Sequence, residues 1–490
     1  MDLSWSVAGS VAGSVAFIAA QVFLSARVLL RRSPLANAHA WLLVLWLLPL
    51  VGMGAYLLIG ESRLGSMRRG KYADSERLLR AHADELWVSR ERTWTGGYER
   101  FRALARLGSA LCEAPPVEGN RLSLHADAAR TLDAMIRDID GAEKHVHLLS
   151  YIFHHRGRPL EVVAALERAA ARGVQCRVAL DGAGSRRFFS RGLARRLRKS
   201  GVEVVELLAV NPLRLLFRRL DLRNHRKVLV IDGRVAYCGS QNITDDAFRP
   251  KGPNGPGPWI DATVRVEGYA ARALALVFLA DWNSESLRPI RDPSAYLPEL
   301  EASAPDEITS AVQILPSGPD GRPGAIQSAM VAAMYAAEQE LIVTTPYFVP
   351  DATVLTALCT AASRGVEVTL ILPKRNDAPL VDHAGRASYR VLLESGVRIL
   401  RYEPGLLHAK TVSVDGKVAL IGSANLDQRS FRINFECTLV VYDDTLASEL
   451  RALQHAYADA SEAIDAETWR TRSLASRLLD NAAALFSPIL

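Results

Sequence analysis

The chain has 490 residues, of which 49% are hydrophobic, so it is long enough for two or three domains with large cores. Its net charge of +6 is modest for this length, and the composition argues against a disordered protein. The five cysteines show no metal-binding spacing, and their odd number does not fit a disulfide framework. We expect them to be small buried residues in a reducing compartment.

Two long uncharged segments open the chain, from Trp5 to Ala26 and from Trp41 to Ile59. At a rise of about 1.5 Å per residue, a helix over either segment would be about 30 Å long, the hydrocarbon thickness of a bilayer. No lysine or arginine precedes the first segment, which argues against a cleaved signal peptide. Two such runs separated by a short basic loop are also rarely buried core helices. The sequence therefore predicts an N-terminal two-helix transmembrane hairpin over residues 1–62.

The basic residues after this hairpin indicate its orientation. They are Arg63, Arg68, Arg69, Lys71, Arg77 and Arg80, against three arginines in the loop between the two segments. By the positive-inside rule, the part of the chain that follows the hairpin is expected on the cytoplasmic side.

The rest of the chain is predicted to contain two related halves. A polar helical linker is expected over residues 63–110, the first half over 111–290, a Pro-rich linker over 291–310 and the second half over 311–490. Each half has the pattern of strand, helix, strand and then a β-hairpin. This pattern predicts an α/β fold in which two pseudo-symmetric domains have mixed β-sheets flanked by helices.

Each half contains one copy of the same polar motif. A histidine is followed by a lysine two residues on, an aspartate five residues further, and then by Gly-Ser-x-Asn. The first copy is His225, Lys227, Asp232, Ser240 and Asn242, and the second is His408, Lys410, Asp415, Ser423 and Asn425. Because both copies have the same internal spacing, they describe one active site built by two halves.

Both copies are predicted to be β-hairpins, since an Asp-Gly pair between two β-rich runs favours a two-residue turn. With Asp232 and Gly233 as the turn, paired residues sum to 465, which sets Ser240 opposite His225. Histidine, lysine, serine and asparagine then gather at one end of each hairpin. Asp232 and Asp415 belong to the catalytic motif but lie roughly 20 Å away, so we expect them to act mainly as turn and support residues.

This set of side chains suits a phosphodiester substrate. Lysine and asparagine donate to phosphate oxygens, so Lys227 and Lys410 are expected to supply charge, and a neutral imidazole can attack phosphorus. The expected phosphate-binding residues are Ser240, Asn242, Ser423 and Asn425. Each half also has one carboxylate at the head of the strand after its hairpin, and we expect Asp261 and Glu436 to orient the histidines. No metal or cofactor is required.

The chain resembles the phospholipase D superfamily and, within it, the membrane-bound bacterial cardiolipin synthases. The resemblance rests on 'LRNHRKVLVIDG', 'GLLHAKTVSVDG', 'GSANLDQRSFRINFE', 'TTPYFVP' and 'WLLVLWLLPLVGMGAYLLIGE'. It implies transfer of a phosphatidyl group between two phosphatidylglycerols, with His225 as nucleophile and His408 as acid and base. Pseudo-symmetry alone does not choose between the two histidines. The second copy departs from the first at Arg429 and Ser430, which have no counterpart in the first half.

The resemblance and the hydrophobic segments together imply a multi-pass integral protein of the bacterial inner membrane. Its expected partners are phosphatidylglycerol and anionic membrane lipid, without nucleic acid, and its oligomeric state is not predicted. Two stretches that mix arginine with leucine and phenylalanine, 186–200 and 212–223, suit docking on anionic lipid or form ordinary solvated faces. A hydrolase acting on phospholipid or nucleic acid uses the same chemistry and stays an alternative, as does a catalytically dead membrane scaffold.

Several other residues of the sequence are expected to have structural roles or are left with two possible roles. The cluster of His145, His147, His154 and His155 lacks companion carboxylates or cysteines at ligand spacing, so a structural role is favoured over a metal site. Tyr151 and Tyr347 fall at matching strand ends and either line the site or pack at its rim. His383 is expected on a loop surface. The C-terminal segment 469–490 either lies on the membrane or packs on the core.

Overall fold

The computed structural model describes residues 2–30, 35–60, 70–71, 74, 97–209, 219, 221–249, 255–299, 310–319 and 323–487. Most of the predicted linker 63–110, the basic stretch 212–223 and the end of the linker 291–310 lie outside these residues. The chain divides into two compact units, one formed by residues 1–65, 211–222 and 489, and the other by the remainder. The second unit, called the body below, holds both copies of the motif.

The N-terminal unit contains α1 (Asp2–Leu30), α2 (Leu35–Leu47) and α3 (Pro49–Ile59). Within the described residues, one helical segment is long and apolar enough to cross a membrane, the 19 residues Ala12–Leu30. The second predicted span is broken at Pro49, and α3 folds back on α2 so that the rings of Trp41 and Tyr56 lie 5.3 Å apart. In the described residues, one candidate span is thus followed by a pair of short apolar helices, and the two-helix transmembrane hairpin stays a prediction.

The first half of the body has the predicted order of strands and helices. It begins with η1 (Glu99–Phe101), α5 (Arg102–Cys112), β1 (Val117–His125), α6 (Ala128–Asp140), β2 (His145–Ser150), α7 (Pro159–Ala171), β3 (Gln175–Asp181), α8 (Arg186–Ser190), α9 (Leu193–Lys199) and β4 (Glu203–Leu207). It continues with β5 (Val228–Ile231), β6 (Val235–Gly239), β7 (Trp259–Ile260), β8 (Thr263–Gly268), α10 (Tyr269–Glu285) and η3 (Ser294–Tyr296).

The second half repeats this order. It begins with β9 (Ser310–Ser317), α11 (Ala325–Ala336), β10 (Glu340–Thr344), α12 (Ala352–Ser363), β11 (Glu367–Pro373), α13 (Pro379–Arg386), α14 (Tyr389–Glu394), β12 (Arg398–Tyr402) and β13 (Leu406–Leu407). It ends with β14 (Thr411–Val414), β15 (Val418–Gly422), α15 (Gln428–Arg432), β16 (Glu436–Tyr442), α16 (Asp444–Asp459), β17 (Ser461–Ala463), α17 (Ala466–Arg470) and α18 (Leu474–Ala484).

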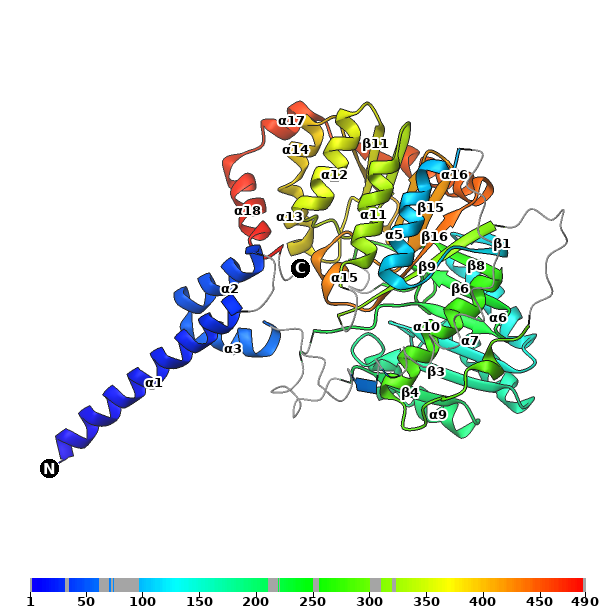
Figure 1. Ribbon diagram of the computed structural model, residues 1–490, viewed down its shortest axis with the longest axis horizontal. Helices are drawn as coiled ribbons and strands as arrows, with labels where there is room; N and C mark the ends of the chain where they lie inside the picture. The colour runs from blue at the N-terminus through cyan, green and yellow to red at the C-terminus, as the bar shows by residue number, and fades with distance from the viewer. Residues whose placement is uncertain are drawn as a thin grey trace. The chain divides into compact units, whose positions relative to one another are not determined.

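Among the described residues, one mixed sheet of 15 strands runs through both halves. The first half contributes the order β1-β8-β6-β5-β2-β3-β4, and the second half contributes the matching order β9-β16-β15-β14-β10-β11-β12-β17. The halves are joined where β1 pairs antiparallel with β9. Helices cover the sheet, with α11 and α12 over the second half and α6 and α7 over the first (Figure 1). The predicted α/β fold with two related halves is confirmed.

Both motif hairpins form, but their register differs from the prediction by one residue. Ile231 pairs with Val235 and Val228 with Cys238, so paired residues sum to 466 instead of 465. Asp232 and Gly233 both have positive φ, at 52° and 66°, and Arg234 donates its N–H to Ile231 without joining the ladder. The loop therefore contains one residue more than a two-residue turn, and Ser240 does not lie opposite His225.

Candidate functional site

The two motif histidines each contact the carboxylate of the other half. The Nδ1 atom of His225 lies 3.0 Å from the carboxylate of Glu436, and Nδ1 of His408 lies 2.6 Å from Asp261. The two carboxylates lie at matching places, because Asp261 stands two residues before Thr263, the first residue of β8, and Glu436, at the start of β16, stands two residues before Thr438. These contacts are reciprocal, so the Nδ1 atom of each histidine is held by a carboxylate of the other half.

Backbone pairing between the halves produces this exchange. The N–H of His225 donates to the carbonyl of Phe435 at 2.9 Å, directly before Glu436. In the pseudo-symmetric position, the N–H of His408 donates to the carbonyl of Ile260 at 2.7 Å, directly before Asp261. The short strands β13 and β7 pair in parallel beside it. Each histidine segment therefore runs alongside the segment that carries the other half's carboxylate.

The motif serines bind these carboxylates. The Ser240 hydroxyl donates to Asp261 at 2.6 Å, and the Ser423 hydroxyl donates to Glu436. Both serine side chains are fully buried. Because a hydroxyl has a single proton to donate, neither serine is also free to donate to a phosphate in this geometry.

Burial keeps both histidines neutral. It lowers the pKa of His225 to about 4 and that of His408 to about 3, although the carboxylates oppose this shift. Burial would raise the pKa of Asp261, but His408, Lys410 and Ser240 outweigh it and bring that pKa to about 2. The pKa of Glu436 is lowered in the same way by His225 and Lys227. Each carboxylate therefore accepts the Nδ1 proton, which leaves a lone pair on Nε2 of a neutral ring.

The two motif lysines are buried beside the histidines. Nζ of Lys227 donates to the carbonyl of His225 and Nζ of Lys410 to that of His408, both at 2.5 Å. Burial lowers the pKa of Lys227 to about 7 and that of Lys410 to about 8. An anion entering the site would raise the pKa of both lysines and favour their charged ammonium forms, because its negative charge offsets the hydration that burial removed.

The two motif asparagines are buried and differ in their partners. Oδ1 of Asn242 accepts the N–H of Ile152 at 2.9 Å, and its Nδ2 has no hydrogen-bond partner among the described residues. In Asn425, Nδ2 lies 3.2 Å from the Ser430 hydroxyl, and Oδ1 has no partner there. Among the described residues, the amide of Asn242 thus keeps an unpaired N–H donor, whereas the amide of Asn425 contacts Ser430.

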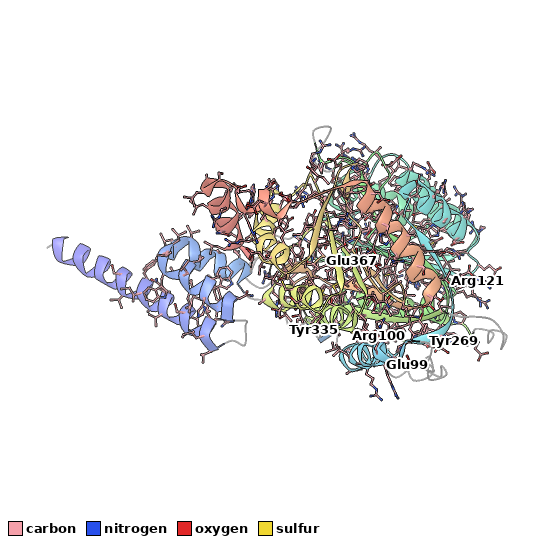
Figure 2. All side chains as sticks on the ribbon, turned by 90° about the horizontal axis from the view of Figure 1, so that it is seen from above. Glu99, Arg100, Arg121, Tyr269, Tyr335 and Glu367 are labelled. Carbon is pink, nitrogen blue, oxygen red and sulfur yellow. The ribbon has the colours of Figure 1, made fainter. Side chains whose placement is uncertain are left out.

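The motif aspartates lie at the turns and bind backbone N–H groups. Asp232 accepts from Glu143, Lys144 and His145 at 2.7 to 2.9 Å. Asp415 accepts from Glu338, Gln339 and Glu340 at 2.7 to 3.0 Å, and also from Arg100, which is labelled in Figure 2. These contacts tie each turn to the start of the neighbouring strand and do not reach the histidines.

Trp259 was missed by the sequence reasoning. Its indole stacks on the ring of His408 with centroids 4.0 Å apart and planes 17° apart. The equivalent position before Glu436 is Asn434, whose amide donates to Glu436 at 3.2 Å. The only signal in the sequence was the Trp-x-Asp spacing, and its stacking partner lies in the other half of the chain. The site is therefore asymmetric around its two histidines.

Tyr151 and Arg226 also lie beside the first histidine. The Tyr151 ring meets the His225 ring edge to face at 5.0 Å, so it lines the site, whereas Tyr347 donates to Asp377 at 2.7 Å. Arg226 is buried and joins the halves, donating to Asp281 of the first half and to the Ser317 and Glu436 carbonyls of the second.

The histidine cluster forms aromatic contacts on the first half. His147 stacks on Phe278 with centroids 4.5 Å apart, and His145 lies 4.7 Å from His147. Within the part of the chain that the structure describes, no group of three or more histidine, cysteine, aspartate or glutamate side chains gathers as a metal site.

Comparisons with known proteins relate the whole chain to lipid enzymes. The family described as "Cardiolipin synthase, PLD-like domain" matches residues 135–254 and 330–456, and the phospholipase D-nuclease N-terminal family matches 19–61. The chain is 40% identical over 476 residues to cardiolipin synthase A of Yersinia pseudotuberculosis serotype O:1b (strain IP 31758), covering 95% of each chain. The protein of that name from Yersinia pestis shows the same values.

Among solved structures, the fold is similar to that of phosphatidylserine synthase from Haemophilus influenzae Rd KW20. The TM-score is 0.59 at 15% identity, and the match covers 79% of this chain and 99% of that one. At this identity the likeness supports the fold alone.

Proposed function

Since the chain belongs to the family of cardiolipin synthases with phospholipase D-like domains and is a phosphatidyltransferase, we propose that it acts through a covalent phosphohistidine. The donor and the acceptor in this proposal are both phosphatidylglycerol, and the products are cardiolipin and glycerol. The observation that carries the proposal is the reciprocal contact of two neutral, buried histidines with two ionised carboxylates.

In the first step, Nε2 of His225 attacks phosphorus of one phosphatidylglycerol and the bond from phosphorus to glycerol breaks. The negative charge of the bound phosphodiester raises the pKa of His408, so that His408 takes up a proton from solution when substrate binds. His408 then gives this proton to the leaving glycerol oxygen and becomes neutral again. We assign the attack to His225 because its side chain is 11% exposed and that of His408 only 2%, so substrate approaches His225 more easily.

In the second step, His408 takes the proton of a glycerol hydroxyl on a second phosphatidylglycerol. The resulting oxygen attacks phosphorus, the bond from phosphorus to His225 breaks, and cardiolipin leaves. Glu436 and Asp261 hold the Nδ1 protons throughout and stabilise the ring that becomes cationic.

We assign charge neutralisation to the lysines and the free Asn242 amide, and a support role to the serines. Lys227 and Lys410 are buried in the site, where the low local dielectric strengthens the attraction between an ammonium and a phosphate. Ser240 and Ser423 hold the carboxylates, which replaces the phosphate contact expected from the sequence. Asp232 and Asp415 support the site indirectly, by tying the hairpin turns to the neighbouring strands.

The enzyme is proposed to reside in the bacterial inner membrane with its body on the cytoplasmic side. The candidate span in α1 supports attachment to a membrane. The cytoplasmic placement rests on the basic residues after Ile59, and a second pass of the chain remains a prediction.

Product analysis tests the reaction. Purified protein in vesicles containing phosphatidylglycerol should form cardiolipin and glycerol in equal amounts, without added metal or nucleotide. Phosphatidic acid as the sole phospholipid product would refute the transferase and support the hydrolase.

Trapping the intermediate tests the roles of the histidines. In His408→Ala, release from the enzyme should slow, so that a phosphatidyl adduct accumulates on His225 and is located by mass spectrometry of peptides. The matched control is the double variant His225→Ala/His408→Ala, which should carry no adduct. An adduct on His408 in His225→Ala, with none in His408→Ala, would reverse the assignment.

A further inference from the structure

Exposed apolar side chains are concentrated on α18 and the turn after it. Among the described residues from 97 onward, nine large hydrophobic side chains are exposed, and five of them lie here: Leu474, Leu478, Leu479, Leu485 and Phe486. The other four, Leu287, Tyr335, Leu380 and Val391, are spread over the body, with Leu380 on the neighbouring α13. All remaining exposed hydrophobics of this kind lie between residues 15 and 58, in the apolar N-terminal unit. In this respect α18 resembles the helices expected in the membrane.

The opposite side of α18 is fixed to the body. The Asp480 carboxylate is buried and bonded to Nδ1 of His383 at 2.8 Å and to Arg472 at 2.7 Å. Ala483 packs in a small core with Val349 and Ala384. His383 is therefore an anchor of this helix and not a free loop residue. Because both buried positions face α13, the apolar side of α18 is held outward.

The charges around this face favour an anionic surface. Asp480 is the only acidic residue of α18, and its burial leaves the exposed side of the helix without a carboxylate. Arg477 is exposed on the same helix. Leucines on one side of a helix, with a cation beside them and no exposed acid, fit the boundary between headgroups and acyl chains.

We propose that α18 docks on the bilayer, with Leu474, Leu478 and Leu485 inserted at the level of the headgroups of phosphatidylglycerol-containing membrane. The body would then have a second attachment, besides the candidate span in α1, that fixes its orientation on the membrane. This proposal depends on neither the phosphohistidine nor the choice of acceptor.

Site-specific fluorescence tests the contact in the full chain. Four of the five cysteines are buried and Cys359 is half-buried, so Cys359→Ser gives a background for a single added thiol. Leu478→Cys carries an environment-sensitive dye, and Ala171→Cys at the end of α7 is the control. Figure 1 shows α7 on the other side of the body from α18. In phosphatidylglycerol vesicles, the dye at 478 should be quenched by a lipid-linked nitroxide, and the dye at 171 by aqueous iodide.

Three outcomes are distinguished. Quenching at 478 by the lipid nitroxide supports docking, whereas quenching there by iodide, as at 171, overturns it. Protection from both quenchers indicates a covering protein segment, from this chain or a second copy, and also overturns it. As an independent readout, Leu478→Ser/Leu485→Ser should lower activity on vesicles about tenfold but leave activity on detergent-dispersed substrate unchanged. Activity measured in detergent separates failure of this proposal from failure of the transferase assignment.

Discussion

The two histidines of the site have different neighbours although their motifs match residue for residue. His408 is covered by the indole of Trp259, whereas the corresponding residue on the other side is Asn434, which contacts Glu436. Stacking fixes the plane of the His408 ring and keeps water from it, so we expect Trp259 to influence the reaction through the position and the pKa of His408. This difference gives a physical basis for two different roles.

Replacing Trp259 should therefore change a pH profile as well as a rate. Burial lowers the pKa of His408, so Trp259→Ala should admit water and raise that pKa toward its ordinary value. We expect kcat to fall about 10- to 100-fold. The acid limb of the plot of kcat against pH, which reports the neutral His408 needed in the second step, should move to higher pH. Trp259→Phe should restore both, and Trp469→Ala on α17 should change neither. An unaltered profile in folded Trp259→Ala would contradict this role.

The lowered pKa values of the two motif lysines predict where activity is lost at high pH. Burial lowers the pKa of Lys227 to about 7 and that of Lys410 to about 8, so in the free enzyme the ammonium charge is present below these values and lost above them. We expect kcat/KM to fall as pH rises through 7 to 8. Bound phosphate raises both pKa values, so the fall in kcat should occur at higher pH. Identical basic limbs in kcat and kcat/KM would contradict the assignment of charge to these lysines.

Much of this residue set was predictable from the sequence, because the repeated spacing identified both motifs and the alignment identified Asp261 and Glu436. The exchange of carboxylates between the halves was not predictable. It depends on hydrogen bonds such as that from His225 to Phe435, which joins segments 210 residues apart and leaves no local periodicity. Trp259 was missed for the same reason.

The motif hairpins show how a turn supports chemistry at a distance. Asp232 and Asp415 have left-handed backbone conformations, with φ of 52° at both, and each carboxylate binds three consecutive N–H groups of another segment. Asp-Gly predicted the turn correctly but not its extra residue. The register was wrong because the third loop residue, Arg234 in the first hairpin, resembles strand sequence.

Substituting these aspartates should affect stability more than chemistry. Asp232→Ala removes three hydrogen bonds and places alanine at positive φ, so we expect the free energy of unfolding to fall by about 2 to 3 kcal/mol. Asp232→Asn keeps an acceptor and tolerates this conformation, so it should lose less. Denaturant unfolding followed by tryptophan fluorescence gives the stability, and kcat of the folded protein should stay within about twofold. A loss of kcat like that of His225→Ala at unchanged stability would contradict the support role.

At the N-terminus, composition predicted apolar helices but not their lengths. The uncharged run from Trp41 to Ile59 has the hydropathy of a span, yet Pro49 divides it and the contact of Trp41 with Tyr56 folds it back. A count of uncharged residues does not detect such a break, although proline itself signals it.

On the scale of the whole molecule, the two halves share one site and one sheet. Arg226 strengthens this union, because its guanidinium is buried and bonds to both halves. Since each histidine is oriented within one chain, mixing His225→Ala protein with His408→Ala protein in the same vesicles should restore no activity. Cardiolipin formation by the mixture, compared with each variant alone and with wild type, measures this. Substantial recovery would mean that halves exchange between chains.

The reciprocal carboxylate contacts also limit how small such an enzyme can be. In a polypeptide with only one copy of this repeat, Nδ1 of the histidine would have no carboxylate to contact. The carboxylate of that copy would likewise have no histidine to orient. Only when two copies meet, as separate subunits or fused in tandem as here, is either ring fixed. Dimerisation is thus built into the architecture, and covalent fusion makes it independent of concentration while allowing the two members, as at Trp259 and Asn434, to diverge.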